Sequence, residues 1–124
     1  MKKILQRFNV TVQGTTNSGN DEGVLLFTNT LRDDYSNVTG VFLVIESGSA
    51  NALFIRLNIG NIEILPKEVS ASLITYNGNF SLKDATYDFS ADKIPARSSS
   101  FEVEFTNHNA DDVVLSLYFV LENL

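Results

Sequence analysis

The chain has 124 residues, of which 44% are apolar and 19% charged, and its formal net charge at pH 7 is -6. This length and composition predict a single globular domain over residues 1–124. The acidic balance excludes nucleic-acid binding as the main function, because phosphate contacts need a basic face. The chain has no cysteine, which excludes disulfides, thiolate catalysis and cysteine-ligated metals.

The first part of the chain is predicted to form strands, and from Phe8 onward apolar and polar residues alternate with a period of two. We expect strands over residues 3–13, 24–30 and 38–46. A long polar loop at 14–23 and a polar turn at 31–37 separate them. The strand at 38–46 is apolar on both faces, which is unusual for a strand that has one side in water.

The middle of the chain is predicted to continue in short strands divided by turn residues. Gly60 and Asn61 indicate either a turn or a bulge within one longer strand. Pro66 is expected to end a strand, because it has no backbone N–H for a ladder. Asn77-Gly78 is the strongest hairpin signal, since both residues tolerate positive φ. The strands expected here cover residues 52–59, 62–65, 69–76 and 79–82.

The last part of the chain gives the clearest pattern. After a short strand at 86–90, apolar and polar residues alternate from 101 to 106, and six turn formers follow at 107–112. The stretch 113–121 is apolar at every odd position and largely apolar at the even ones. We expect the last two strands to form a hairpin, with the final strand covered on both sides.

Eight or nine short strands, with no helical period of ten residues or more, predict an all-β fold. The expected architecture is an antiparallel β-sandwich of about eight strands, jelly-roll-like. The strands at 38–46 and 113–121 are apolar on both faces, and a sandwich of two sheets buries only the inner face of each strand. We therefore expect a homo-oligomer, with interface residues on the second faces of these strands: Val114, Tyr118, Val120, Phe42 and Val44.

Residues suited to catalysis or metal binding do not gather in a recognisable pattern. The single histidine, His108, lies in a predicted turn near Asp111 and Asp112, whose side chains would point to opposite faces of a strand. Glu102 and Glu104 are expected to keep the outer face of their strand exposed to solvent and to hinder edge pairing. We therefore predict no catalytic residues, no metal and no cofactor, and a protein that is not an enzyme.

A resemblance adds to this interpretation. The segment Ile94-Pro95-Ala96-Arg97-Ser98-Ser99-Ser100, followed by the alternating strand to Thr106-Asn107, is similar to a late segment of single jelly-roll virion proteins of bacteriophages. The resemblance implies a capsid, vertex or decoration subunit that binds copies of itself and neighbouring shell proteins. Its implied location is the virion, after synthesis in a host cytoplasm, with the loop at 14–23 facing outward.

Two further expectations concern location and an alternative function. Gln6, Arg7 and Asn9 interrupt any apolar core of a signal peptide, and no stretch approaches the ~18 apolar residues of a membrane span.

The alternative function is that of a carbohydrate-binding β-sandwich module, for instance for host attachment. Its candidate ligand-binding residues are Tyr35 and Tyr76, since sugars pack against flat aromatic side chains.

Overall fold

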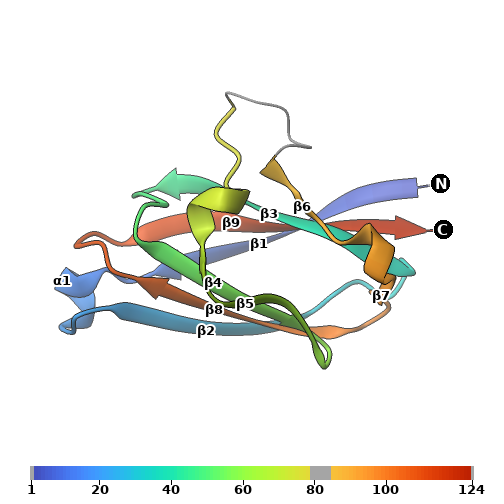
Figure 1. Cartoon of the computed structure of the whole chain (residues 1–124), viewed down its shortest axis with the longest axis horizontal. Coiled ribbons are helices and arrows are strands. Elements are labelled where there is room, and N and C mark those ends of the chain that lie inside the picture. Colours follow the sequence, from blue (N-terminus) through green and yellow to red (C-terminus); the bar gives the residue numbers. More distant parts are fainter. Residues whose placement is uncertain (1, 79–84, 124) are drawn as a thin grey trace.

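The computed structural model describes residues 2–78 and 85–123, which form two antiparallel sheets packed face to face (Figure 1). Sheet A contains, in spatial order, β1 (Lys2–Val12), β9 (Val113–Asn123), β3 (Asn37–Ser47) and β6 (Tyr87–Asp88), and β7 (Ile94–Pro95) also pairs with β3. Sheet B contains β2 (Gly23–Thr30), β8 (Ser100–Asn107), β4 (Leu53–Ile59) and β5 (Ile62–Ser70). The short helices are α1 (Thr15–Ser18), η1 (Ala71–Ile74) and η2 (Ser90–Asp92).

The connectivity confirms the predicted fold class. The chain passes back and forth between the two sheets, and its last two long strands enter the middle of each sheet: β8 lies between β2 and β4, and β9 lies between β1 and β3. This wrapping gives an all-β, antiparallel, jelly-roll-like sandwich. The two ends of the chain lie beside each other, because Lys2 pairs with Asn123 (Figure 1).

The core lies between the sheets and follows the predicted alternation. The odd residues of β9 from Val113 to Leu121 are all 0% exposed, and so are Val103 and Phe105 of β8. Four phenylalanines join the layers: the ring of Phe101 lies 4.9 Å from Phe8 and 4.7 Å from Phe119, measured between centroids, and Phe27 packs at the margin. Such aromatic pairs contribute about 0.5–1.5 kcal/mol each beyond their burial.

The predicted terminal hairpin is wrong, because β8 and β9 lie in different sheets. Asn107 is the residue at which the chain changes sheets, and it is fully buried. Its side-chain amide donates to the carbonyl oxygens of Val12 at 3.3 Å and Asp111 at 3.1 Å. The turn is therefore held by β1 rather than by a partner strand of the hairpin.

Two expectations for the middle of the chain are also wrong. Pro66 does not end its strand, since β5 runs from Ile62 to Ser70 at the edge of sheet B, where a missing N–H can face away from the ladder. The strand expected at 69–76 gives way to the 3₁₀ helix η1, which buries Ala71 and Ile74. That spacing of three suits a 3₁₀ turn better than a strand.

Other local expectations have a mixed outcome. Gly60 has a φ of +59° and Ile59 pairs with Ile62, so this site is a tight turn and not a bulge. The polar loop at 14–23 contains one helical turn, α1. The return strand expected at 79–82 lies outside the described residues. Among the described residues, no helix is long and apolar enough to cross a membrane.

Candidate functional site

The five predicted interface residues all lie on the outer face of sheet A. Val114, Tyr118 and Val120 alternate along β9 with the fully buried residues of the core. On β3, Phe42 lies directly opposite Tyr118 in the register and Val44 lies opposite Ser116. The period-two pattern therefore placed these side chains on one shared face, pointing away from the second sheet.

Exposure separates Phe42 from the other four residues. Val114, Tyr118, Val120 and Val44 are half-buried, whereas Phe42 is only 2% exposed in the single chain. The Phe42 ring stacks on the Tyr118 ring, with centroids 4.9 Å apart and planes 7° from parallel. Phe42 is thus packed within its own chain, and the four others are the side chains that a partner can reach.

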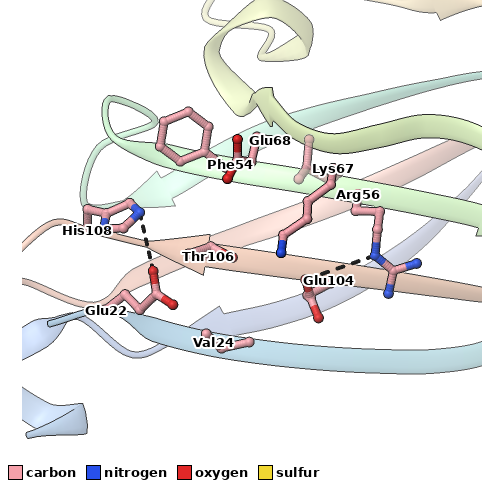
Figure 2. Close-up of a pocket in the computed structure, with 10 residues that line it drawn as sticks. Glu22, Val24, Phe54, Arg56, Lys67, Glu68, Glu104, Thr106 and His108 are labelled. Atoms are coloured by element: carbon pink, nitrogen blue, oxygen red, sulfur yellow. Dashed lines mark ion pairs between the residues drawn. The ribbon is translucent and has the colours of Figure 1, made fainter. Parts of the chain in front are cut away.

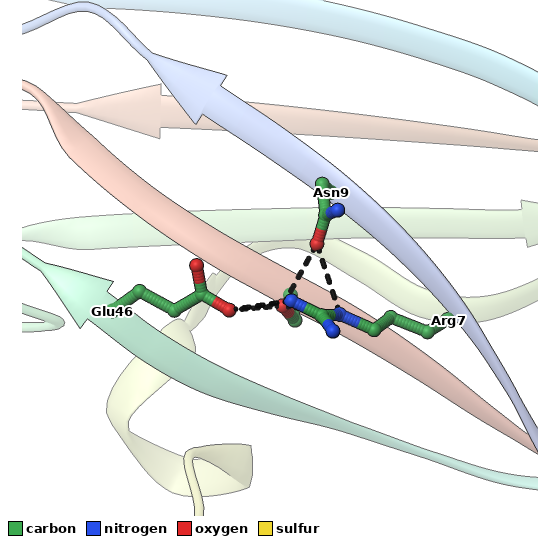
Figure 3. A network of polar contacts seen from close by, with 4 residues as sticks. Arg7, Asn9 and Glu46 are labelled. Atoms are coloured by element: carbon green, nitrogen blue, oxygen red, sulfur yellow. Dashed lines mark hydrogen bonds and ion pairs between the residues drawn. The ribbon is translucent and has the colours of Figure 1, made fainter.

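A polar network interrupts the apolar face (Figure 3). The Arg7 guanidinium donates to Asn9 Oδ1 at 3.0 Å, to Ser116 Oγ at 3.0 Å and to Glu46 Oε1 at 2.8 Å. Ser116 Oγ also lies 2.7 Å from Glu46 Oε1. The network joins β1, β9 and β3. It supplies hydrogen-bond partners to the hydroxyl of Ser116, which is why this polar side chain can be fully buried.

Beside this network, near the chain ends, the outer face of sheet A is hollowed into a groove of about 640 Å³. Leu5 and Val120 are paired in the register and form its apolar wall, and Leu5 is 47% exposed. Glu122 lines the same groove, is 6% exposed and lies 3.7 Å from Lys3 Nζ. The groove therefore combines reachable apolar side chains with a nearly buried carboxylate.

The outer face of sheet B carries a second groove, of about 540 Å³ (Figure 2). Arg56, Glu104 and Thr106 point out of β4 and β8 into it, and Lys67 reaches over from β5. Arg56 lies 3.6 Å from Glu102 and 3.9 Å from Glu104. The floor of this groove is thus polar and carries both signs of charge.

One end of the second groove is formed by His108, Glu22 and Phe54. His108 Nε2 lies 3.5 Å from Glu22 Oε2, and its ring meets the Phe54 ring edge-on with centroids 5.6 Å apart. Hydrogen-bonding groups beside an aromatic ring are the usual chemistry of sites for small polar molecules. This end of the groove therefore combines an aromatic ring with hydrogen-bonding side chains.

Tyr35 and Tyr76 do not contribute to either groove. Tyr35 is 6% exposed and belongs to the core, with the Arg32 guanidinium 5.5 Å from its ring centroid. Tyr76 is half-buried, and its backbone N–H donates to the Leu43 carbonyl at 2.8 Å. Tyr35 therefore offers no open ring face of the kind that sugar stacking requires, whereas the half-buried Tyr76 stays a prediction.

The acidic side chains near His108 are engaged in separate contacts. Asp112 accepts hydrogen bonds from Gly14 and Asn17, and Glu22 faces His108. In the part of the chain that the structure describes, no three histidine, aspartate or glutamate side chains are grouped so that they could hold an ion.

The groove of sheet B was missed at the level of the sequence. Its signal was present in part, because Phe54 and Arg56 alternate with the buried residues of their strand and must point outward. Nothing local indicates that Phe54 lies opposite Thr106, or that Lys67 reaches the same place. The first of these neighbours follows from the pairing of strands about 50 residues apart, and the second from the pairing of β5 with β4. No protein-family model, curated protein or solved structure matches the chain.

Proposed function

We propose that the protein is a structural subunit that works by binding copies of itself through the outer face of sheet A. The observation that carries the proposal is the groove in which Leu5 and Val120 are accessible beside half-buried Tyr118. Apolar side chains on the face of a sheet forgo about 1.5–3 kcal/mol each when they stay in water, so covering them favours association.

The setting that we propose is a virion, in which the chain is a capsid, vertex or decoration subunit beside neighbouring shell proteins. The support is architectural, because jelly-roll sandwiches recur as capsid subunits. The acidic net charge of -6 favours a role in the shell over a role at the packaged nucleic acid. Synthesis would take place in the host cytoplasm, and mass spectrometry of purified particles would detect the chain.

The assembly is tested by light scattering at micromolar concentration. We expect a closed oligomer of the 13.7 kDa chain, and a marked loss of that oligomer when Val120→Lys places a charge in the groove. Ser72→Lys, at an exposed position of η1, is the matched control and should assemble normally. A wild-type chain that stays monomeric throughout would overturn the proposal.

A second function is supported by the groove on sheet B, where Phe54, His108 and Arg56 surround a polar floor. A carbohydrate would find ring contact and hydrogen-bond partners there, as in a binding module for host attachment. A glycan array with the wild type and Phe54→Ala tests this function. Binding that Phe54→Ala removes would support it, and a blank array would reject it.

A further inference from the structure

The edges of the two sheets differ in how they are protected against strand pairing. β1 carries Lys3 and Arg7, and the β5 edge carries Pro66, Lys67 and Glu68. Charged residues and proline are the usual means by which edge strands avoid other strands. β2, in contrast, reads GVLLFTNT and has neither a charge nor a proline.

The backbone of β2 presents its free hydrogen-bonding groups at even positions. The Leu31 N–H donates to the Ser99 carbonyl at 2.9 Å, just beyond the paired residues Thr30 and Ser100. Because bonded and non-bonded pairs alternate in an antiparallel ladder, the odd residues of β2 bond to β8. The N–H and C=O groups of Val24, Leu26 and Thr28 therefore point toward the open edge.

The side chains along this edge are also apolar and accessible. Val24 is 56% exposed and Leu26 is 54% exposed, both on the outer face of sheet B. On the inner face, Leu25 and Phe27 are only half-buried, although they pack against the core. An uncharged strand of eight residues with free backbone groups and reachable apolar side chains is a template for another strand.

We propose that the free edge of β2 binds β2 of a second copy, antiparallel, across a two-fold axis that passes through Leu26. The two sheets B then join into one continuous sheet. This inference rests on the proposed self-assembly, but it concerns a surface distinct from the outer face of sheet A. It would give each subunit two different contacts, and a subunit that adds a two-fold contact to a second interface can build assemblies larger than either contact forms alone.

A second copy fits this edge better than a charged partner does. Pairing about Leu26 places Leu26 opposite Leu26 of the other copy and Val24 opposite Thr28, so no like charges meet. Each copy carries a net charge of -6, so two copies repel each other where their acidic side chains meet. β2 has no charged residue, so two copies can pair along it without placing charges in the contact. Glu22, next to the strip, is already paired with His108 of its own chain.

Cysteine cross-linking tests the geometry directly, because the natural chain has no cysteine. Directly opposed residues of a bonded antiparallel pair have Cα atoms about 5.5 Å apart, which a disulfide can span. We expect Leu26→Cys to form a covalent dimer rapidly under mild oxidation. Leu73→Cys, at a position that is 72% exposed on η1, should cross-link far more slowly.

Two more variants define the register and the energetics. Thr28→Cys alone should cross-link poorly, and Val24→Cys combined with Thr28→Cys should cross-link well. Leu26→Lys puts two like charges opposite each other, so it should raise the dissociation constant of this contact at least ~10-fold. Equal cross-linking at positions 26, 28 and 73, or unchanged association of Leu26→Lys, would overturn the pairing.

Hydrogen exchange separates this inference from the proposed function. Concentrating the wild type should slow exchange at the amides of Val24, Leu26 and Thr28. It should do so in the Val120→Lys variant as well, since that residue lies on the other sheet. Oligomers that depend on Val120 without protection of β2 would reject the inference and leave the proposed function standing. Protection of β2 with no effect of Val120→Lys would reject the sheet A interface instead.

Discussion

The side chain of Asp112 accepts a hydrogen bond from the backbone N–H of Gly14 at 2.9 Å. The contact joins the residue just before β9 to the residue two places after the end of β1. Asn17 Nδ2 adds hydrogen bonds to the same carboxylate at 3.0 and 2.9 Å. The polar stretch after β1 is thus held in a helical turn by a side chain from the far end of the sequence.

This contact predicts a pH dependence of stability. The hydrogen bonds from Gly14 and then Asn17 hold the pKa of Asp112 below its ordinary value of 3.8. Because the unfolded chain binds the proton more readily, the contribution is present above pH 3.8 and is lost as the pH falls below it. Asp112→Asn should melt at a lower temperature than the wild type at neutral pH, and the difference should shrink in acid.

Thermal melts of both proteins from about pH 7 to about pH 2.5 measure this effect. Asp111→Asn is the matched control, since it removes a charge from the adjacent exposed position. It should leave the melting temperature near that of the wild type. A gap between Asp112→Asn and the wild type that stays constant over this range would contradict the prediction.

Asn107 is expected to be among the residues most sensitive to substitution. Its amide serves the carbonyls of Val12, Gln13 and Asp111, and its Oδ1 accepts from the Asn109 N–H at 2.9 Å. Asn107→Ala removes these hydrogen bonds at a fully buried position and should lower the free energy of unfolding by about 1–3 kcal/mol. Asn107→Asp should cost more, because a carboxylate would face the same carbonyl oxygens.

Urea unfolding measures both changes at Asn107. Asn20→Ala, at an exposed position after α1, is the control and should stay within about 0.5 kcal/mol of the wild type. If Asn107→Asp were as stable as the wild type, the amide would not be the donor that holds the crossing between the sheets.

The faces of the strands could be predicted from the sequence, because alternation is a local property. Phe101 and Val103 point into the core for the same reason that Glu102 and Glu104 point out of it. The pairing of strands is not local, and the expected hairpin failed for that reason. Asn107 reads as one turn former among six, and its role depends on carbonyls more than 90 residues away.

The candidate surfaces show the same limit. The period of two placed Val120 and Phe42 on one face correctly. It could not show that Phe42 is covered while Leu5, next to Val120, is open. The free edge of β2 could not be predicted either. It follows from the order of the strands in sheet B, and the sequence does not show which strand lies at the end of a sheet.

Two glycines with positive φ provide a matched pair. Gly48 has a φ of +90°, and a Cβ there would lie 2.6 Å from the Asp112 carbonyl oxygen. Gly60 has a φ of +59°, and a Cβ there would meet nothing within 4 Å. Gly60→Ala should cost about 1–2 kcal/mol from backbone strain alone. Gly48→Ala should cost about 1–3 kcal/mol more, because the backbone of the β8–β9 connection must move.

Chemical denaturation of the two alanine variants checks the difference between Gly48 and Gly60. Equal losses would mean that the connection before β9 yields freely, and that Asp112 does not fix its position.

Phe42 distinguishes packing within the chain from packing between chains. Its ring is 2% exposed and stacks on Tyr118, so Phe42→Ala should destabilise the isolated chain by about 3–5 kcal/mol. Val44→Ala, two residues along the same outer face, removes a half-buried side chain and should cost less than about 2 kcal/mol. Both are measured by urea unfolding in the Val120→Lys background, in which association through sheet A is suppressed. A loss at Phe42 no larger than that at Val44 would mean that Phe42 acts mainly in the contact between subunits, as the sequence pattern suggested.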